Sequence, residues 1–506
     1  MKLRSFKAFP YGLLSIATYL RKKISDKVNV QLFDCNIDSD KDFVELLKQK
    51  LSELKPDVVG ISMMFDNSYK HLSDISAIIK NSNNKTIVVL GGLASISSAE
   101  FILNEQKNVD AICYYEGEKP LLKLIESEQP ISHLECSSSW ITRKSIIENR
   151  IYQKDSVLNL DEVVAIDYSF VDIELYAMRE GFSPFVNIIN NKKQFFLVTS
   201  RGCPFRCTFC MHSSDSDKSM RYASVEAIIK HVEFLVSALG MNVLTIYDDQ
   251  ILLNRERAKQ LFKEFSRFNI RIECPNGLSV AFMDDELIGF MRSAGMDTVS
   301  LAIESGSPYV LNNLMHKPLR IEMVKPIVES LRKHDFWIQG YFVSGLPGED
   351  DTHREETVKF IKEVGLDWSG FSLAVPIKGS ELYKNCIENG FIEEEKSIKD
   401  LYFNKYIIKT PKYSPEYVTK KTYQMNLDVN FVNNYRMKKG DYKTASDAFK
   451  DVIARYENHA FAYYYLSKAL TALKDQNGTN EAFGKYCQII DESTEWKEYA
   501  EHFNLK

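Results

Sequence analysis

The sequence predicts an α/β protein in three parts: an N-terminal Rossmann-like, doubly wound parallel sheet, a central partial (β/α)6 barrel, and C-terminal all-α helical repeats. Strand-like Val/Ile/Leu runs alternate with helix-period segments over residues 1–125 and again over 195–390. Such alternation is typical of parallel sheets that helices cover on their faces. The last part of the chain contains helix-period segments without strand-like runs between them.

The N-terminal part sets short apolar strands between amphipathic helices. We expect helices at 11–23, 43–54, 72–80, 99–104 and from 119, and strands at 28–33, 57–62, 86–92 and 109–114. Residues 130–195 mix charged, Asn-rich and short alternating pieces. We expect a linker with a small hairpin there, with a turn at 187–191.

The central part repeats a strand–helix unit six times. The expected strands are 195–199, 243–247, 270–273, 298–303, 337–343 and 368–376. The helices expected between them are 224–239, 255–268, 284–294, 321–333 and 353–364. Six such units make a partial version of the eight-unit barrel.

The C-terminal part should be all helical, with helices at 420–438, 442–455, 460–473 and 480–491. Ala445, Phe449, Leu466 and Phe483 fall roughly where a tetratricopeptide helix pair places its packing residues. Two such repeats rarely stand alone, so we expect them to pack on the barrel or cap it. The predicted boundaries are 1–128, 129–194, 195–392, 393–425 (a connecting segment) and 426–506.

Composition narrows the class of protein. The 506 residues are 44% hydrophobic and 26% charged, with a net charge of −5, which predicts a soluble globular protein without a nucleic-acid partner. No apolar run approaches the ~18 residues of a spanning helix, and the N-terminus lacks a cleavage site, so we expect no membrane contact and a cytoplasmic location. Nine scattered cysteines argue against a disulfide framework.

Three of these cysteines are clustered and call for an explanation. Cys203, Cys207 and Cys210 have the spacing C-x3-C-x2-C on a loop after an expected strand. Iron–sulfur clusters are held by Cys thiolates, usually four, so three would leave one iron open to a ligand. Two alternatives remain open: a zinc site with His212 as fourth ligand, and cysteines that only pack.

Read with its context, this motif resembles that of the radical S-adenosylmethionine (SAM) superfamily, over residues 195–390, and Phe209 matches the family's aromatic position. The resemblance implies a [4Fe–4S] cluster on the three cysteines, whose open iron binds the amino and carboxylate groups of SAM. It implies reductive cleavage of SAM to methionine and a 5′-deoxyadenosyl radical that takes hydrogen from a substrate. It also implies an electron donor such as flavodoxin or ferredoxin.

Polar residues follow the other expected strands at the carboxyl face, where barrel enzymes build their sites. The resemblance implies that SAM is bound by residues at these strand ends: Asp249 (or Asp248), Asn276, Glu304, Ser305 and Gly345. Each has an alternative. The Asp pair could begin a turn or helix, Glu304 could pair with an arginine, and residues 345–348 could be a plain turn.

The N-terminal part resembles the cobalamin-binding domain that precedes many radical SAM enzymes. The resemblance covers residues 1–126, through 10–14, 57–62, Gly91-Gly92 and 116–118. It implies corrin contacts at small residues of the strand ends, Ser62, Gly91, Gly92 and Ser95, and also at Glu116 and Gly117. No Asp-x-His-x-x-Gly motif indicates an axial histidine, and His71 is expected to be solvated. A domain retained for packing and substrate closure is the alternative.

The leading hypothesis is a cobalamin-dependent radical SAM C-methyltransferase acting on a small molecule or peptide. The alternatives are a radical oxidoreductase or cyclase with a vestigial cobalamin domain, and a helical-repeat scaffold without catalysis. A methylthiotransferase is disfavoured, because the N-terminal part has no second cysteine triad. No residue beyond the cofactor motifs indicates a catalytic role, and the C-terminal helices could bind a protein partner or only pack.

Overall fold

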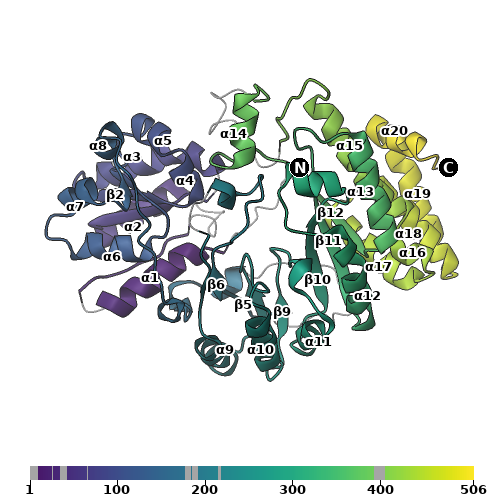
Figure 1. Cartoon of the computed structure of the whole chain (residues 1–506), viewed down its shortest axis with the longest axis horizontal. Coiled ribbons are helices and arrows are strands. Elements are labelled where there is room, and N and C mark those ends of the chain that lie inside the picture. Colours follow the sequence, from purple (N-terminus) through teal and green to yellow (C-terminus); the bar gives the residue numbers. More distant parts are fainter. Residues whose placement is uncertain are drawn as a thin grey trace.

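The computed structural model describes residues 9–24, 27–34, 43–64, 66–176, 184, 192–214, 218–392 and 405–505. Figure 1 shows an arc, with the N-terminal sheet and its helices at one end, the barrel strands in the centre, and the C-terminal helices at the other end. The predicted fold class, mixed α/β with parallel sheets and an all-α C-terminal segment, is confirmed.

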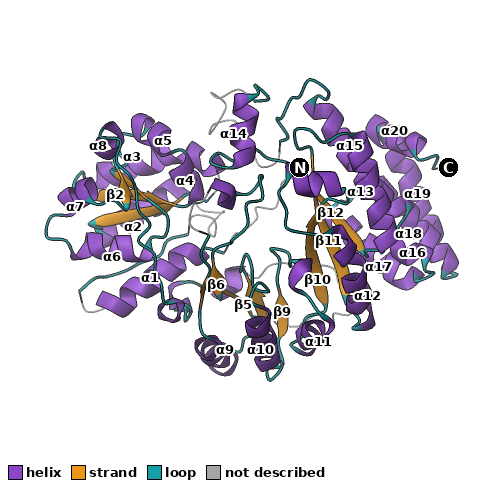
Figure 2. Cartoon of the chain, viewed as in Figure 1, coloured by secondary structure: helices purple, strands orange, loops and turns teal. Residues whose placement is uncertain are grey.

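The N-terminal sheet has the strand order β1-β2-β3-β4. β1 (Val58–Ser62), β2 (Ile87–Gly91) and β3 (Ala111–Cys113) are parallel, and β4 (Trp140–Ile141) is antiparallel. The helices are α1 (Tyr11–Ile24), α2 (Phe43–Leu54), α3 (Leu72–Ser82), α4 (Leu93–Ser97), α5 (Ala99–Glu105) and α6 (Glu118–Glu126). Figure 2 shows this sheet among its helices. The short η1 (Asp66–His71) precedes α3.

One prediction for this half is wrong. Residues 28–33 form no strand; Leu32 and Phe33 pack against apolar clusters as irregular chain, so burial without a ladder partner produced the strand-like pattern. The described part of 130–195 contains no hairpin. It forms α7 (Pro130–Cys136), β4, α8 (Arg143–Ile147), η2 (Leu160–Glu162), η3 (Tyr168–Phe170) and η4 (Ile173–Tyr176). The turn predicted at 187–191 lies outside the described residues, and the hairpin expected around it therefore stays a prediction.

The six barrel strands fall where the sequence predicts them. They are β5 (Gln194–Leu197), β8 (Val243–Ile246), β9 (Arg271–Glu273), β10 (Thr298–Glu304), β11 (Trp337–Ser344) and β12 (Trp368–Leu373). They form two parallel three-stranded sheets, β5-β8-β9 and β10-β11-β12, which meet at the bridge between Leu278 and Leu301. Within the described chain these strands form no closed barrel.

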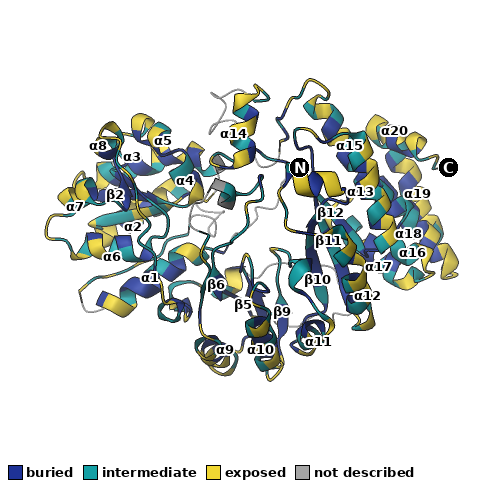
Figure 3. Cartoon of the chain, in the orientation of Figure 1, coloured by how far each residue is buried: buried dark blue, intermediate teal, exposed yellow. Residues whose placement is uncertain are grey.

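The helices between these strands are α9 (Val225–Leu239), α10 (Arg255–Phe265), α11 (Asp285–Ser293), α12 (Val324–Lys333), preceded by η8 (Ile321–Met323), and α13 (Asp351–Val364). Side chains of Ser224, Asn254, Asp284 and Asp350 cap the amino ends of four of them. The strands are dark and the outer helix faces exposed in Figure 3. The main apolar core also takes in Phe9 and Leu14 from the N-terminal part.

The C-terminal segment is all helical in its described residues. It consists of α15 (Pro415–Leu427), the π turn η10 (Asp428–Val432), α16 (Tyr435–Lys438), α17 (Tyr442–Arg455), α18 (Ala460–Ala472), α19 (Gln476–Glu492) and α20 (Thr494–His502). Ala445, Phe449 and Leu466 are buried as predicted. Phe483 is not, because it is 39% exposed while Tyr486, one turn later, packs in the core.

The helical segment packs on the barrel through a buried carboxylate. Asp367, just before β12, has a fully buried side chain that pairs with Arg332 at 3.1 Å and with Arg436 of α16 at 2.5 Å. This docking agrees with the expectation that the C-terminal helices pack on the barrel. No helix of the described chain is long and apolar enough to cross a membrane.

Candidate active site

The cysteine loop is closed at its base by two short antiparallel strands. β6 (Ser200–Arg201) pairs with β7 (Arg221–Tyr222). Gly202 has φ of 103°, and a Cβ there would lie 2.4 Å from the carbonyl oxygen of Ser219, so only glycine fits. Cys203, Cys207 and Cys210 are all partly buried, and the amide of Cys210 donates to the carbonyl of Cys207 at 2.9 Å.

Backbone bonds hold the loop between two other loops of the barrel. Thr208 donates from its amide to Met315 O at 2.9 Å and from its hydroxyl to Leu314 O at 2.7 Å. The amide of Leu382, at the start of α14 (Glu381–Glu388), donates to Thr208 O at 2.8 Å. Phe209 packs into the apolar cluster of the same loops, so its aromatic ring fixes the loop.

Glu304 ends β10 in a strained conformation. Its φ is 71°, and the β10–β11 register shifts between Ala302 and Glu304. The π turn η7 (Val310–Leu314) follows and returns the chain, so that Lys317 Nζ lies 3.1 Å from Glu304 Oε1. Strained backbone and π turns of this kind cluster at functional sites.

Lys317 places a positive charge beside the cysteines. Its side chain is 13% exposed and that of Glu304 12%. Burial lowers the pKa of Lys317, but Glu304 and the thiols of Cys207 and Cys203 outweigh it and the pKa is raised. Burial also raises the pKa of Cys207 to about 11, while Lys317 opposes this. The ammonium can therefore balance negative charge on Glu304 and on bound thiolates.

Asp248 and Asp249 differ in their surroundings. The buried Asp248 carboxylate accepts from the amide and hydroxyl of Thr199, both at 2.6 Å, and from the Ser200 hydroxyl at 2.5 Å. It thus ties β8 to the strand before the cysteine loop. Asp249 is exposed. Burial raises the pKa of the Cys203 thiol and the Asp249 carboxylate raises it further, which places Asp249 near that cysteine.

The remaining predicted SAM residues also include both an exposed residue and residues that shape the loops. Asn276 is exposed after β9 and donates to Tyr247 O at 2.8 Å, beside the end of β8. Ser305 is buried, and its hydroxyl lies 3.2 Å from that of Thr357 on α13. Gly345 has φ of 94°, and a Cβ there would lie 2.8 Å from the Tyr406 ring. Ser305 and Gly345 therefore shape loops, while Asn276 stays open.

The carboxyl ends of β1 and β2 form an open apolar edge. Ser62 is exposed and pairs in register with Gly91, where an added Cβ would meet no atom of the described residues within 4 Å. Met64 and Leu93, just beyond these ends, are 53% and 37% exposed. An open apolar edge of this kind fits the flat face of a corrin.

Gly92 and Ser95 build the turn at this edge. Gly92 has φ of 98°, and a Cβ there would lie 2.4 Å from Met63 O. The buried Ser95 hydroxyl donates to Gly92 O at 2.7 Å. The structure gives both residues a part in shaping the entry into α4, and their predicted corrin contact stays a prediction.

Glu116 and Gly117 lie at the contact with the cysteine loop. Glu116 pairs with Arg201 at 3.2 Å and also with Arg221. Gly117 precedes α6, and a Cβ there would lie 2.7 Å from Ile16 Cδ1 of α1. The Glu116 carboxylate is thus engaged between the two halves of the chain, and its predicted corrin contact stays untested.

The open edge of the N-terminal sheet lies beside the cysteine loop. A Cβ built on Gly379, after β12, would lie 3.5 Å from Ser97 Cβ of α4 and 3.4 Å from Met211 Cε. Met211 directly follows Cys210. The two carboxyl edges therefore face one common region of the molecule.

Comparison with known families agrees with this geometry. Residues 197–361 match the radical SAM superfamily, and residues 4–125 match the B12 binding domain. This is a radical SAM protein with a B12-binding domain. The radical SAM part contains the cysteine loop, and the B12-binding part contains the open edge of Ser62 and Gly91.

The relatives of this radical SAM protein include methyltransferases. It is 27% identical over 400 residues to cytidylyl-2-hydroxyethylphosphonate methyltransferase of Streptomyces wedmorensis, covering 74% of each chain. It is 26% identical over 383 residues to an uncharacterized methyltransferase of Pyrococcus horikoshii, covering 76% of this chain and 79% of that one.

Two solved structures share the fold of this radical SAM protein. One is the radical SAM methyltransferase TsrM from Kitasatospora setae, with a TM-score of 0.58, 18% identity, and coverage of 76% of this chain and 74% of that one. The other is the cobalamin-dependent SAM radical enzyme OxsB, with a TM-score of 0.55, 16% identity, and coverage of 94% and 68%.

The donor set of the radical SAM domain fits an iron–sulfur cluster. Each thiolate of a cluster binds a different iron, whereas a zinc ion needs all its ligands around one point. Among the described residues, no three His, Cys, Asp or Glu side chains come close enough to share one metal ion. The side chain of His212, the fourth ligand of the zinc alternative, lies outside the described residues.

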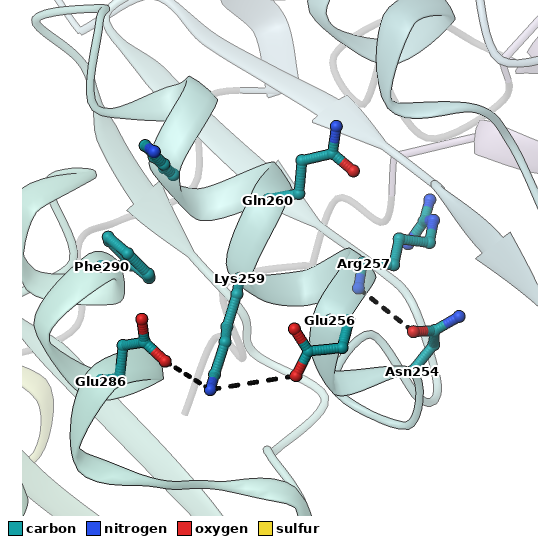
Figure 4. A pocket seen from close by; sticks show the side chains of 8 residues that line it. Asn254, Glu256, Arg257, Lys259, Gln260, Glu286 and Phe290 are labelled. Atoms are coloured by element: carbon teal, nitrogen blue, oxygen red, sulfur yellow. Dashed lines mark hydrogen bonds and ion pairs between the residues drawn. The ribbon is translucent and has the colours of Figure 1, made fainter.

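A hollow on the outer helices of the radical SAM domain lies apart from this site. Its lining comes from α10, α11 and the residue before α10: Asn254, Glu256, Arg257, Lys259, Gln260, Lys263, Glu286 and Phe290. In Figure 4 Lys259 reaches between Glu286, at 2.6 Å, and Glu256, at 4.0 Å. These charges are paired with one another on the outer surface, so the hollow adds nothing to the site.

Sequence reasoning missed Lys317, Met64 and Leu93 as site residues. Lys317 lies between the π turn and Pro318 and belongs to no periodic pattern. The available signal for Met64 and Leu93 was their place directly beyond two strand ends, where a large apolar residue has no core to enter.

Proposed function

We propose that this protein is a cobalamin-dependent radical SAM enzyme that methylates carbon in a small molecule or peptide. The observation that carries the proposal is the contact region at Gly379, where Ser97 of the B12-binding domain and Met211 of the cysteine loop come together. Cofactors held at these two edges would share one reaction space.

Three cysteines and three strand ends would hold the cluster and SAM. Cys203, Cys207 and Cys210 would bind the cluster, which when bound supplies the electron that cleaves SAM. SAM would be bound from β8, β9 and β10 by Asp249, Asn276 and Glu304. Lys317 would balance the added negative charge, while Asp248, Phe209, Ser305 and Gly345 would fix the loops around SAM.

The open edge of the N-terminal sheet would hold cobalamin. Ser62 and Gly91 leave room for the ring, and Met64 and Leu93 offer it apolar contact. Gly92 and Ser95 would hold the turn below it. The relatives that are named methyltransferases support methyl transfer as the chemistry of this pair of domains.

The proposal includes the domain boundaries and the roles of the C-terminal helices and of an electron donor. Domains at 1–128, 195–392 and 426–506, with connecting segments at 129–194 and 393–425, enclose both family matches. The C-terminal helices would be tetratricopeptide-like and open to a protein partner, and a flavodoxin or ferredoxin would deliver electrons in the cytoplasm.

A second candidate is radical chemistry without methyl transfer. A relative from Rubrivivax gelatinosus, 22% identical over 383 residues, is named anaerobic magnesium-protoporphyrin IX monomethyl ester cyclase. An enzyme of that kind would use the same cysteine loop and SAM residues but would add no methyl group to its product.

The decisive experiment is anaerobic purification and reconstitution. We expect about four irons per chain, a corrin absorption spectrum, and both 5′-deoxyadenosine and S-adenosylhomocysteine from SAM with dithionite. The variant Cys203→Ala/Cys207→Ala/Cys210→Ala should lose iron and 5′-deoxyadenosine, and Cys136→Ala/Cys487→Ala, at two exposed cysteines, should not. 5′-Deoxyadenosine without corrin or S-adenosylhomocysteine would favour the second candidate.

A further inference from the structure

Arg201 joins the cysteine loop to the N-terminal domain. It lies two residues before Cys203, and its guanidinium reaches Glu116 at 3.2 Å and Glu118 at 2.8 Å. It also donates to the Ser15 hydroxyl at 3.0 Å, and that hydroxyl donates to Glu118 at 2.7 Å. The residue beside the cluster ligands is therefore bound to α1 and to the start of α6.

The ion pairs are buried and involve both strands at the base of the loop. The side chains of Arg201 and Glu116 are each 16% exposed and that of Glu118 is 4% exposed. Arg221, on the paired strand β7, donates to Glu116 at 3.0 Å. Removing one member of this network would leave the other charges buried without a partner, which is strongly unfavourable.

Further contacts join the same parts of the chain. Gly117 lies between the two carboxylates, and a Cβ there would lie 2.7 Å from Ile16 Cδ1 of α1. Tyr11, at the start of α1, accepts a hydrogen bond from the amide of Val198 at 3.0 Å, just after β5. The ion pairs of Arg201 and the hydrogen bond from Val198 to Tyr11 thus hold α1 and the start of α6 against the base of the cysteine loop.

We infer that Arg201 and Glu118 are positioning residues that fix the distance and orientation of the open edge of Ser62 and Gly91 relative to the cysteine loop. This inference rests on the proposed function, because a fixed distance matters only if both edges hold cofactors. It also gives Glu116 a role between the domains. Cleavage of SAM at the cluster would need the radical SAM domain alone. Transfer of a methyl group from SAM to cobalamin reduced by dithionite, with S-adenosylhomocysteine as the leaving group, would need both domains in register.

The test compares three conservative variants with a matched control in the reconstituted full chain. Glu118→Gln keeps the size and removes the charge, Arg201→Lys keeps the charge and loses the fork, and Glu118→Asp keeps the carboxylate. The control is Glu162→Gln, which removes an exposed pair with Lys23 at the other end of α1. Iron content and corrin absorption are measured for each chain.

Two readouts decide the result. In Glu118→Gln and Arg201→Lys we expect amide hydrogen exchange across α1 and α6 to become about tenfold faster, with α17 and α18 unchanged. We expect the ratio of S-adenosylhomocysteine to 5′-deoxyadenosine to fall about tenfold while 5′-deoxyadenosine formation stays within about twofold of the parent. Glu118→Asp should recover part of both, and Glu162→Gln should match the parent.

The outcomes separate this inference from the proposed function. Parent-like exchange and product ratio in Glu118→Gln and Arg201→Lys would overturn the inference. So would an equal loss of both products together with corrin, because that is the result of a merely structural role. If the parent itself binds no corrin and yields no S-adenosylhomocysteine, the proposed function fails. Hydrogen exchange would still show whether Arg201 holds the N-terminal domain against the radical SAM domain.

Discussion

Lys317 Nζ lies 3.1 Å from Glu304 Oε1 at the carboxyl end of β10, and both side chains are largely buried. The two residues are not neighbours in the sequence. They meet because the π turn η7 brings Lys317 back to the strand end. It sets a cation beside Cys203 and Cys207, where a bound cluster with three thiolates and an anionic ligand group would concentrate negative charge.

Lys317→Met should weaken SAM binding and destabilise the chain. The substitution keeps the length of the side chain but leaves Glu304 uncompensated, and breaking a buried pair costs about 3–5 kcal/mol. The SAM concentration for half-maximal 5′-deoxyadenosine formation should rise about tenfold or more. Urea unfolding and a SAM titration measure the two effects.

The matched control for this substitution is Lys384→Met, at an exposed i,i+4 pair on α14. Its free energy of unfolding should change by less than about 0.5 kcal/mol, as for other exposed pairs. An unchanged SAM titration in Lys317→Met would contradict a role for Lys317 beside SAM.

Substitutions of Asp248 and Asp249 should have different effects, the first on stability and the second on SAM binding. Asp248→Asn would turn an amide toward the donors of Thr199 and Ser200, and we expect a loss of about 1–3 kcal/mol in unfolding free energy. Asp249→Asn, at an exposed position, should change that free energy by less than about 0.5 kcal/mol but raise the SAM requirement. The reverse pattern would assign the SAM contact to Asp248.

Glycine substitutions test whether a corrin binds at the open edge of the N-terminal sheet. Gly91→Ala meets no atom within 4 Å, so the fold should persist while corrin absorption per chain falls, because the methyl group would occupy the space of the ring. Gly60→Ala, in the middle of the edge strand β1, also meets no atom of the described residues within 4 Å and is the control. Equal corrin content in both variants would argue against a ring over Gly91.

Gly92→Ala should differ from both variants. Its φ is 98° and its Cβ would lie 2.4 Å from Met63 O, so we expect a loss of about 1–3 kcal/mol in unfolding free energy, measured by urea titration. A parent-like stability would show that this turn can relax.

Much of the fold could be predicted because local periodicity decides it. The helix α2 begins and ends at the predicted residues, and all six barrel strands lie within the predicted ranges or one residue beyond them. The predicted strand at 28–33 failed because Leu32 and Phe33 are partly buried without a strand partner among the described residues. Pairing is a long-range property that an alternating pattern cannot reveal.

The site was predictable where it depends on a loop motif and a strand end. The predictions of Cys203, Asp249 and Glu304 depend on such positions in the sequence. The sequence does not distinguish Asp248 from Asp249, whereas in the structure Asp248 is buried and hydrogen-bonded and Asp249 is exposed. Arg201 and Glu118 are 83 residues apart in the chain, and only the docking of two domains makes them partners. Such cross-domain pairs leave no local pattern in the sequence.

His231 on α9 should make the chain less stable in acid. The ring is 6% exposed and stacks near Tyr168 and Phe234, and burial lowers its pKa from 6.5 to about 4. Between pH 6.5 and 4 the unfolded chain binds the proton and the folded chain does not. Stability therefore falls as pH falls through this window, by about 2 kcal/mol between pH 7 and 5 for this one group.

His231→Phe should remove that share of the pH dependence, because phenylalanine can stack on the same rings without titrating. The measurement is the difference in unfolding free energy between pH 7 and pH 5, in parent and variant. His502→Phe, at an exposed histidine of α20, should leave this difference as in the parent. If His231→Phe keeps the full acid loss, the buried ring takes up its proton in the folded chain, and other groups must cause the acid sensitivity.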